Sequence, residues 1–560
     1  GGECDLQDQA FKYGNGESFF KENKRSVADK NLGPFIKTYM TRCIHCTRCI
    51  RFLDDIAGSQ EIGATGRGEN MEITSYLEKN IISEMSGNII DLCPVGALTS
   101  KPYSFSARSW ELKPSKAIDL MDSLGSNLYI DTMENQVMRV RPDENCKISN
   151  GWITDKTRFS YDGFSIQRIN NFYVREKNSE NKSKGKLKIC SKEEAFNNIK
   201  QAIEALQNEK QEKYNRQESL DKFNLADKIA AISGEFTSME NLFLLKKMIN
   251  KLSSDNYHSK NFLNSKFNQS IKSKEDYIIN NNIENIKSSD FILLISTNVR
   301  QNNPLTNSLI VQNSKNNNNI YKIGNFNIKQ NYNINMLSDN LLILDNIIKN
   351  EANNKLDHNE SNFLTNFKNS KDPVIIIGKD AYINDDFSMI KNSINKFITK
   401  YHPNIKPNNI INILHNNASD VGACSLNFFS NNSINTAKIL FLNAYDDIDH
   451  IPNRNNKFII YMGHHGDRGA SIADVILPIT CPNIEEDGSY QNNFGLIQQN
   501  NKIIKGPSNA LYNYAMIIEL ENYLLKTKQD INIKTIRNNM ITEINHINDN
   551  RQKRARKTQR

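Results

Sequence analysis

The chain has 560 residues, with 71 lysine and arginine residues against 63 aspartate and glutamate residues and a mean hydropathy of −0.61. This length suits several domains rather than one. No apolar run approaches the roughly 18 residues that a membrane helix needs, so the sequence excludes a membrane-spanning protein. Six of the basic residues lie in the last ten, so the body is nearly neutral and the formal charge of +8 does not indicate nucleic-acid binding.

Cysteine is concentrated at the N-terminal end, in a small domain that we place over residues 1–110. Five of the nine cysteines fall in the first 93 residues, and three of them form a C-x2-C-x2-C run. Three thiolates at this spacing can bind three corners of one cubane, and a remote cysteine followed by proline can bind the fourth. Structural zinc usually takes two separated ligand pairs and fits less well. The sequence therefore predicts one [4Fe–4S] cluster on Cys43, Cys46, Cys49 and Cys93.

The side chains beside these four thiols have other expected roles. His45 lies inside the run, but four thiolates already saturate a cubane, so we expect a neighbour and not a ligand. Arg42, Arg48 and Arg51 either offset the negative charge of the cluster and shift its potential, or are ordinary surface residues. Cys4, separated from the run by 38 residues, would by itself be interpreted as a small buried residue.

The pattern changes twice after residue 110. Residues 111–165 alternate apolar and polar side chains in short runs, which predicts a β-rich segment. Residues 166–550 contain strand-length apolar runs followed by helical stretches, which predicts an α/β fold with Rossmann-like parallel sheets covered by helices. The predicted strands include 228–233, 291–296, 374–377 and 439–442, with a helix over 238–252. Asparagine is abundant from about residue 170 onward and is expected in solvated loops.

Several other motifs are interpreted as structural. The glycine-rich segment 63–68 lacks the ending of a phosphate loop and is expected to form a turn. The pair His464–His465 could supply metal ligands or an acid–base pair, but no carboxylate or nucleophile stands at a readable spacing, so a tight loop is favoured. Three later cysteines are expected to be buried thiols, consistent with a reducing compartment: Cys190, Cys424 and Cys481.

The C-terminal end combines a helical pattern with a basic tail. Apolar residues recur at helical spacing from Leu511 to about Asn548. The tail, residues 551–560, carries no aromatic residue on which a base could stack. We therefore expect a disordered terminus or a strip that docks on anions, and not a nucleic-acid interface.

Eight short segments resemble one known family. They are Gly1–Gln9, Met40–Phe52, Gly63–Gly68, Ser86–Ser100, Trp152–Phe159, Gly463–Asp467, Ile472–Pro478 and Glu486–Tyr490. Together they resemble the large iron–sulfur subunit of respiratory complex I, NADH:ubiquinone oxidoreductase, of the 75 kDa type. The resemblance is dense over residues 1–165, patchy through the asparagine-rich middle and clear again near 460–500.

The resemblance implies a ferredoxin-like iron–sulfur domain followed by a large molybdopterin-oxidoreductase-like domain without molybdenum. Ser296 stands where active molybdopterin enzymes usually have glycine, and Leu496 stands where an arginine would follow Gly495. No metal-binding Cys or Ser can be assigned in that large domain. Cys146 is solitary, so the additional cluster of some bacterial members is expected to be absent.

The resemblance also gives Cys4 a role. In the family a His-x3-Cys-x2-Cys-x5-Cys motif holds a second [4Fe–4S] cluster, and Cys4 matches only its last cysteine. The other ligands are expected upstream of Gly1. The chain is then expected to be the C-terminal portion of a longer subunit, or part of a divided subunit in which a separate chain carries the N-terminal cluster domain.

The implied function is electron transfer within a proton-translocating NADH:ubiquinone reductase, with no catalytic residue in this chain. Electrons would pass from the flavin-bearing, NADH-oxidising subunit toward the quinone-site and ferredoxin-like subunits. The expected location is the matrix side of the mitochondrial inner membrane, in the peripheral arm. Two alternatives stay open: a catalytic molybdopterin-dependent oxidoreductase, which stoichiometric molybdenum or tungsten would reveal, and a zinc-bearing nucleic-acid-binding protein, which zinc without acid-labile sulfide would reveal.

Overall fold

The computed structural model describes residues 2–76, 79–144, 146–176, 185–215, 227–263, 265–325 and 330–558. The chain forms two compact units. The first comprises residues 1–162, 280–378 and 393–412, and the second comprises residues 163–279, 379–392 and 413–560. Each unit is therefore built from segments that are far apart in the sequence.

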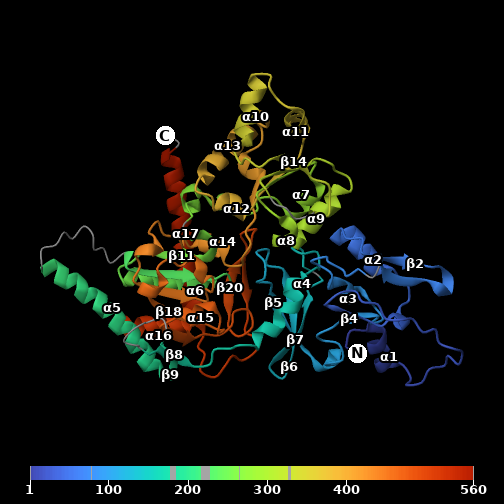
Figure 1. The fold of residues 1–560 in the computed structure, drawn as a ribbon, viewed down its shortest axis with the longest axis horizontal. Coiled ribbons are helices and arrows are strands. Elements are labelled where there is room, and N and C mark those ends of the chain that lie inside the picture. Colours follow the sequence, from blue (N-terminus) through green and yellow to red (C-terminus); the bar gives the residue numbers. More distant parts are fainter. Residues whose placement is uncertain are drawn as a thin grey trace. The chain divides into compact units, whose positions relative to one another are not determined.

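The first unit begins with short elements around the N-terminal cysteines (Figure 1). Its helices here are α1 (Asp5–Tyr13), α2 (Arg48–Phe52) and α3 (Asn88–Leu92), with a π-helical turn at Leu53–Ala57 directly after α2. Two antiparallel pairs complete this part: β1 (Ile36–Thr38) with β4 (Leu98–Ser100), and β2 (Ile62–Thr65) with β3 (Glu72–Ser75). Of the segment 63–68 that was predicted to form a turn, residues 63–65 belong to β2, and the turn begins at Gly66, which has φ +71°.

A three-stranded antiparallel sheet follows in the same unit. Its strands are β5 (Lys113–Ile118), β6 (Asn127–Met133) and β7 (Gln136–Pro142), paired in chain order. The short helix α4 (Asp155–Phe159) contacts β7. Alternate side chains of β6, such as Leu128 and Ile130, are buried, which is the pattern of a half-covered strand. The strands lie at residues 113–142 of the predicted β-rich segment 111–165, and its last part is helical.

A five-stranded sheet forms the remainder of the first unit, in the order β14-β13-β12-β15-β16. The strands are β12 (Phe291–Ile295), β13 (Ile320–Ile323), β14 (Asn335–Ser338), β15 (Pro373–Ile377) and β16 (Ile411–Ile413). Helix α7 (Ile283–Ser288) precedes β12, and the helices between the strands are α8 (Val299–Asn302), α9 (Pro304–Ser314), α10 (Ile343–Ala352) and α11 (His358–Asn369). After β15 the chain forms α12 (Lys379–Tyr382), which belongs to the second unit, and α13 (Phe387–Tyr401). β12 pairs in parallel with β13 and β15, and both β12 and β15 are fully buried, as their unbroken apolar runs predict.

Within the first unit, the cysteine-bearing part packs on the five-stranded part. The π-helical turn Leu53–Ala57 contacts α9, and the next residue, Gly58, has φ +68°. A Cβ atom on Gly58 would lie 2.7 Å from Val311, so glycine is needed for this close approach. Arg300 pairs with Glu84 at 2.9 Å. These contacts tie the two parts together.

The second unit is built on a seven-stranded sheet in the order β11-β10-β17-β18-β19-β8-β9. The strands are β8 (Phe172–Arg175), β9 (Leu187–Cys190), β10 (Ile229–Ser233), β11 (Tyr257–Ser259), β17 (Ile439–Asn443), β18 (Phe458–Gly463) and β19 (Val475–Pro478). The first five in that order are parallel, and β8 and β9 extend the sheet in antiparallel pairs. The predicted α/β fold class with parallel sheets is confirmed.

Helices and one hairpin accompany this sheet. They are α5 (Lys192–Asn215), α6 (Met239–Lys251), α14 (Asp420–Ser425), α15 (Arg468–Ile472), α16 (Asn513–Leu525), α17 (Ile533–Thr558) and the hairpin of β20 (Gly488–Gln491) with β21 (Ile497–Asn500). Ser238 caps α6, because its hydroxyl accepts from the backbone N–H of Asn241. α6 packs against α16 and α17, and α5 packs on β8 and β19 (Figure 1).

The basic C-terminal tail is not the disordered terminus that its composition suggested. α17 continues to Thr558, so most of the stretch 551–560 is helical. Arg551 anchors this end of the helix: its buried guanidinium donates to the carbonyl of Cys424 at 2.8 Å and lies 5.6 Å from the ring centre of Tyr277. A tertiary contact of this kind cannot be inferred from composition. In the described part of the chain, no helix is both long and apolar enough to cross a bilayer.

Candidate metal centre

The four predicted cluster ligands meet in one small cavity of the first unit. Cys43, Cys46, Cys49 and Cys93 all line it, and all are free thiols. The remaining lining is mostly apolar: Met40, Ile44, Ile73, Leu92, Val95, Ala97 and Leu98, with Thr47 and Arg48. The fold thus brings the remote Cys93 to the C-x2-C-x2-C run, as the sequence predicts.

Three of these thiols lie on a tight turn that leads into α2. Cys43 ends the short 3-10 turn Met40–Arg42, and Cys49 lies at the start of α2. Between them His45 and Thr47 have φ values of +54° and +59°, a left-handed conformation that residues other than glycine rarely adopt. This turn lets three successive thiols face one cavity. It also places the backbone N–H of His45 3.4 Å from the Sγ of Cys43.

Cys93 directly follows α3, and a later segment clamps the start of that helix. The carboxylate of Asp155 accepts from the backbone N–H groups of Ser86–Gly87, at 3.0 and 2.7 Å. Asn88 forms a reciprocal pair with the backbone of Ile153: its Nδ2 donates at 2.8 Å, and its Oδ1 accepts at 3.2 Å. The position of Cys93 therefore depends on these buried hydrogen bonds.

The arrangement of the thiols fits a cluster better than a single ion. In the described residues, no three His, Cys, Asp or Glu side chains form a group that could hold one metal ion. Zinc needs its thiolates about 2.3 Å from one point, whereas a [4Fe–4S] cubane takes one thiolate at each corner. Burial raises the pKa of Cys43 and raises that of Cys49 to about 12, and neighbouring thiols add to both shifts. A metal that binds here must displace these protons.

The charged neighbours of the run take different places. Arg48 lines the thiol cavity. Arg42 lies 5.0 Å from the ring centre of Tyr39, and Arg51 is exposed. His45 contributes its backbone N–H to a sulfur atom, which fits the expected neighbour. Of the three arginines, Arg48 is therefore the one placed to act on charge inside the cavity.

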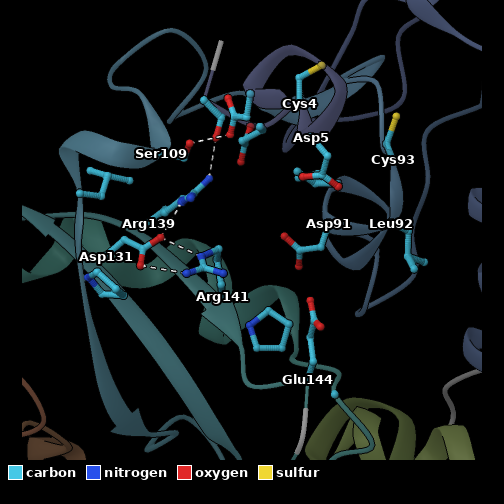
Figure 2. Close-up of a pocket in the computed structure, with 18 of the residues that line it drawn as sticks. Cys4, Asp5, Asp91, Leu92, Cys93, Ser109, Asp131, Arg139, Arg141 and Glu144 are labelled. Atoms are coloured by element: carbon cyan, nitrogen blue, oxygen red, sulfur yellow. Dashed lines mark hydrogen bonds and ion pairs between the residues drawn. The ribbon is translucent and has the colours of Figure 1, made fainter. Parts of the chain in front are cut away.

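Cys4 lies beside a second, larger pocket of the same unit (Figure 2). Cys4, Arg48, Leu92 and Cys93 line this pocket, whose volume is about 660 Å³. Arg48, Leu92 and Cys93 also line the thiol cavity, so the two spaces share a wall. The Sγ of Cys4 accepts from the backbone N–H of Gln7 at 3.2 Å and caps α1. Cys4 is thus adjacent to the four-thiol cavity but outside it.

Backbone contacts hold the Cys4 segment against the loop that follows Cys93. The N–H of Leu6 donates to the carbonyl of Pro94 at 3.0 Å. Gly96 has φ +62°, and a Cβ atom on it would lie 2.9 Å from the Cβ of Cys4. The nearness of Cys4 and Cys93 is therefore built into the fold.

Paired charges line another part of the second pocket. Figure 2 shows Asp131 between Arg139 and Arg141, whose Nε atoms lie 2.8 and 2.7 Å from Asp131 Oδ2. Arg139 also donates to the carbonyl of Gly2 at 2.9 Å. Burial raises the pKa of Glu3, which lines the same pocket, to about 7. This wall is polar, and its charges largely neutralise one another.

The carboxyl edge of the seven-stranded sheet, the usual ligand position in an open α/β sheet, is filled by the chain itself. Glu486 is buried there and accepts from the backbone N–H of Asn513 at 2.7 Å and from the hydroxyl of Thr480 at 2.9 Å. Burial raises the pKa of Glu486 to about 7. After β10, a Cβ atom on Gly234 would lie 1.9 Å from the carbonyl oxygen of Ala444, so the two loops are closely packed.

The pair His464–His465 forms part of a packed loop after β18. The carbonyl of His464 accepts from Arg168 Nε at 3.1 Å, and Arg168 forms a two-pronged ion pair with Glu485. Burial, with help from His465 and Arg168, lowers the pKa of His464 to about 3. A buried, neutral histidine whose backbone carbonyl is bonded to Arg168 supports the structure of the loop, as the sequence predicts.

Other residues singled out from the sequence have distinct environments. Ser296 has φ +45°, a backbone conformation that favours glycine. This agrees with the sequence comparison, in which active molybdopterin enzymes usually have glycine at this position. Leu496 is 57% exposed. Cys424 and Cys481 are buried as predicted, but Cys190 is only partly buried because it lies on the edge strand β9, so that prediction was wrong.

Sequence reasoning did not single out the clamp formed by Asp155 and Asn88. A local signal exists for α4, because Thr154 precedes it and accepts from the backbone N–H of Thr157 in the manner of an N-cap. Nothing in the local pattern indicates that the next residue, Asp155, binds the start of α3. That pairing becomes visible when the tertiary structure is known.

Three family models match the chain. Residues 33–99 match the ferredoxin-like domain of NADH-quinone oxidoreductase subunit 3, residues 112–162 match the NADH-ubiquinone oxidoreductase NDSU1/NuoG-like 4Fe-4S domain, and residues 168–523 match molybdopterin oxidoreductase. The first match contains all four thiols of the cavity, and the second contains one cysteine, Cys146.

Curated relatives align with nearly the whole chain. An NADH-quinone oxidoreductase subunit from Rickettsia typhi is 39% identical, over 98% of this chain and 77% of the relative. The NADH-ubiquinone oxidoreductase 75 kDa subunit of Reclinomonas americana is 38% identical, over 94% of this chain and 74% of the relative. The mitochondrial 78 kDa subunit of Candida albicans is 36% identical, over 94% and 68%. These matches favour neither a catalytic molybdopterin enzyme nor a zinc-bearing nucleic-acid binder. The chain belongs to the family of large iron–sulfur subunits of NADH-quinone oxidoreductase, respiratory complex I.

Proposed function

We propose that this chain is an electron-transfer subunit of NADH:ubiquinone oxidoreductase and relays electrons from the flavin side toward quinone. The observation that carries the proposal is the cavity lined by Cys43, Cys46, Cys49 and Cys93. The cavity lies in the stretch that matches a ferredoxin-like domain. The chain contributes a relay to the enzyme and has no substrate site of its own.

The four thiolates would bind one [4Fe–4S] cluster, which carries one electron at a time. The apolar lining keeps water away from the sulfur atoms. The backbone N–H of His45 donates to Cys43 Sγ, a contact that favours the more negative, reduced state. Arg48 adds positive charge to the same wall and acts in the same direction.

We assign Cys4 as one ligand of a second [4Fe–4S] cluster whose other ligands come from outside residues 1–560. The shared wall of the two spaces supports this assignment, because Cys93 and Arg48 face both of them. A cluster at Cys4 would then lie next to the cluster of the four-thiol cavity. Short separations of this kind suit one-electron transfer.

The remainder of the chain is proposed to be scaffold and interface. In this division, residues 1–110 form the iron–sulfur domain, residues 111–165 open the molybdopterin-oxidoreductase-like domain, residues 166–550 form its α/β body, and residues 551–560 form a basic tail. The large domain would hold no molybdenum. The packing of Glu486 and its partners into the carboxyl edge supports this role.

The proposed partners are other subunits of complex I: the flavin-bearing NADH-oxidising subunit, and the quinone-site and ferredoxin-like subunits. A separate chain carrying the N-terminal cluster domain is a further proposed partner, since it would supply the ligands that complete the Cys4 site. The proposed location is the matrix side of the mitochondrial inner membrane, which the mitochondrial relatives support.

Metal and sulfide analysis of the anaerobically reconstituted full chain tests the relay. We expect iron and acid-labile sulfide in equal amounts, about four of each per chain. Cys93→Ala should lose at least the iron that Cys93 binds. Cys146→Ala is the matched control, because Cys146 is a buried thiol of the same unit outside the cavity. Zinc without sulfide, or stoichiometric molybdenum, would contradict the proposal.

A further inference from the structure

A set of buried oxygen atoms lies at the turn between β5 and β6. Residues 119–126 connect the two strands, and the backbone N–H of Asp119 donates to the carbonyl of Ser126 at 2.8 Å. This bond continues the antiparallel register in which Ile118 faces Asn127. Residues directly opposite each other in such a pair project to the same face. Asp119 and Ser126 therefore lie side by side, and Asp122 belongs to the same closed loop.

The three side chains are withdrawn from solvent but not fully hydrogen-bonded. Asp119, Asp122 and Ser126 are 1%, 3% and 0% exposed. Asp122 Oδ1 accepts from the backbone N–H of Leu124 at 2.9 Å. Within the described residues, Asp122 Oδ2 and the Ser126 hydroxyl have no hydrogen-bond partner. Buried polar atoms are rarely left in this state, because their desolvation is not compensated.

Asp119 is held in a fixed orientation. Its Oδ1 accepts from the backbone N–H of Met121 at 2.9 Å, and its Oδ2 accepts from the hydroxyl of Thr157 at 2.7 Å. The hydroxyl of Thr154 lies 2.9 Å from that of Thr157 and can donate to it. Each carboxylate oxygen has two lone pairs, so both oxygens of Asp119 keep acceptor capacity.

The positive charge of Lys156 acts on both carboxylates, but its ammonium group is hydrogen-bonded elsewhere. Burial raises the pKa of both Asp119 and Asp122. The nearby ammonium of Lys156 donates to the carbonyl of Met121 at 3.2 Å. The arginine ion pairs of this part of the unit involve other carboxylates, those of Asp131 and Asp91. Two buried carboxylates need a proton or a cation between them.

The chemistry of the surrounding segment favours a cation with oxygen ligands. Residues 112–162 match a 4Fe-4S domain, yet the one cysteine there, Cys146, uses its Sγ to accept from the backbone N–H of Asn127 at 3.4 Å. Asp119, Asp122 and Ser126 themselves offer only oxygen atoms as ligands, and Oδ2 of Asp122 and the hydroxyl of Ser126 have no hydrogen-bond partner among the described residues. Hard divalent cations such as Mg²⁺ and Ca²⁺ prefer this donor set.

We propose that Asp119, Asp122 and Ser126 bind one hard divalent cation, Mg²⁺ or Ca²⁺, through their carboxylate and hydroxyl oxygens. The ion closes the β5–β6 turn. Thr157, which donates to Asp119, lies on α4 together with Asp155, which clamps α3. The ion therefore stabilises α4 and, through Asp155, the helix α3 that precedes Cys93. It does not contact the four-thiol cavity.

Ion titration of the full chain with its cluster assembled tests the proposal. After passage over a chelating resin, the chain is titrated calorimetrically with MgCl2 and, separately, with CaCl2. One equivalent of one ion should bind and raise the melting temperature. Asp122→Asn should weaken binding at least about tenfold and abolish the ion-dependent rise. Glu134→Gln, on the exposed turn between β6 and β7, is the matched control and should bind as the parent chain does.

The same samples separate this site from the cysteine site. The visible absorption of the cluster should persist in Asp122→Asn, so loss of ion binding is not a consequence of cluster loss. Ser126→Ala, which removes a neutral oxygen, provides a second variant if Asp122→Asn does not fold, and it should weaken binding several-fold. If the parent chain binds neither ion, the proposal is overturned. Asp119 and Asp122 then share a proton instead. Equal ion affinity in the parent chain and in Ser126→Ala also overturns it.

Discussion

Two regions of the molecule differ in whether their polar side-chain atoms are bonded within the chain. They are the four-thiol cavity of the first unit and the carboxyl edge of the seven-stranded sheet in the second unit. In the cavity, four free thiols face a mostly apolar space. At the sheet edge, Glu486 is bonded to Asn513 and Thr480, and Gly234 and Ala444 close the space between two loops. The first arrangement has ligand atoms to offer, whereas the second has used them internally.

This difference shows why a fold does not fix a function. The second unit retains the parallel sheet and the strand-end loops at which α/β proteins bind ligands. Its side chains, however, satisfy one another. The first unit uses short helices and turns with positive φ angles, and it leaves four free thiols lining one cavity, where we propose that a cluster binds. Four substitutions test the comparison, in decreasing order of expected effect.

Removing one thiol should have the largest effect. Cys49→Ala deletes a proposed ligand in the first turn of α2, so the iron content of the reconstituted chain should fall well below four per chain. Cys481→Ala removes a buried thiol of the second unit that does not line the four-thiol cavity, and it should leave the iron content unchanged. Equal iron content in the two variants would contradict the claim that the four-thiol cavity, and not the second unit, binds the iron.

Weakening the clamp on α3 should come next. Asp155→Asn removes the charge that binds the N–H groups of Ser86–Gly87, and we expect a loss of about 1–3 kcal/mol in the free energy of unfolding. Thermal denaturation and cluster retention report the effect. Glu69→Gln, at an exposed position of the same unit, is the control. An unchanged melting temperature would mean that the clamp does not hold Cys93 in place.

The closed sheet edge should respond to pH. Burial raises the pKa of Glu486 from 4.5 to about 7, so its stabilising contribution is complete below about pH 4.5 and is lost as the pH rises to about 7. Glu486→Gln lacks this titration. Relative to the parent chain, its free energy of unfolding should therefore improve by up to about 3 kcal/mol between pH 4.5 and pH 8. A difference between the two proteins that is constant over this range would contradict the burial of an ionisable Glu486.

The smallest effect is expected at Ser296. Its φ of +45° is unfavourable for a residue with a Cβ atom, so Ser296→Gly should change stability by less than about 1 kcal/mol, in the stabilising direction. The neighbouring variant Thr297→Gly, where no positive φ occurs, should destabilise. Melting temperatures distinguish the two cases, and a lower value for Ser296→Gly would show that its hydroxyl matters more than its backbone.

Much of this architecture follows from local sequence patterns. Buried strands such as β10 and β17 are predicted within one or two residues, because mainly apolar runs of strand length, bounded by polar residues, have few alternatives. The four-thiol site is predicted from spacing alone, since the geometry of a cubane constrains which cysteines can share it.

Contacts between distant segments could not be predicted in this way. The pairing of Asp155 with α3, the ion pair of Arg168 with Glu485 and the anchoring of Arg551 on Cys424 join residues that have no common local pattern. The partly exposed Cys190 illustrates the same limit, because its burial depends on β9 being at a sheet edge. Composition could not show that the basic tail continues α17 for the same reason.

Low-temperature EPR of the reduced full chain tests the cluster assignment most directly. Cys93→Ala and Cys146→Ala differ in whether the thiol removed lines the four-thiol cavity. We predict that the cluster signal is lost or strongly altered in Cys93→Ala and preserved in Cys146→Ala. An unchanged signal in Cys93→Ala would contradict the assignment.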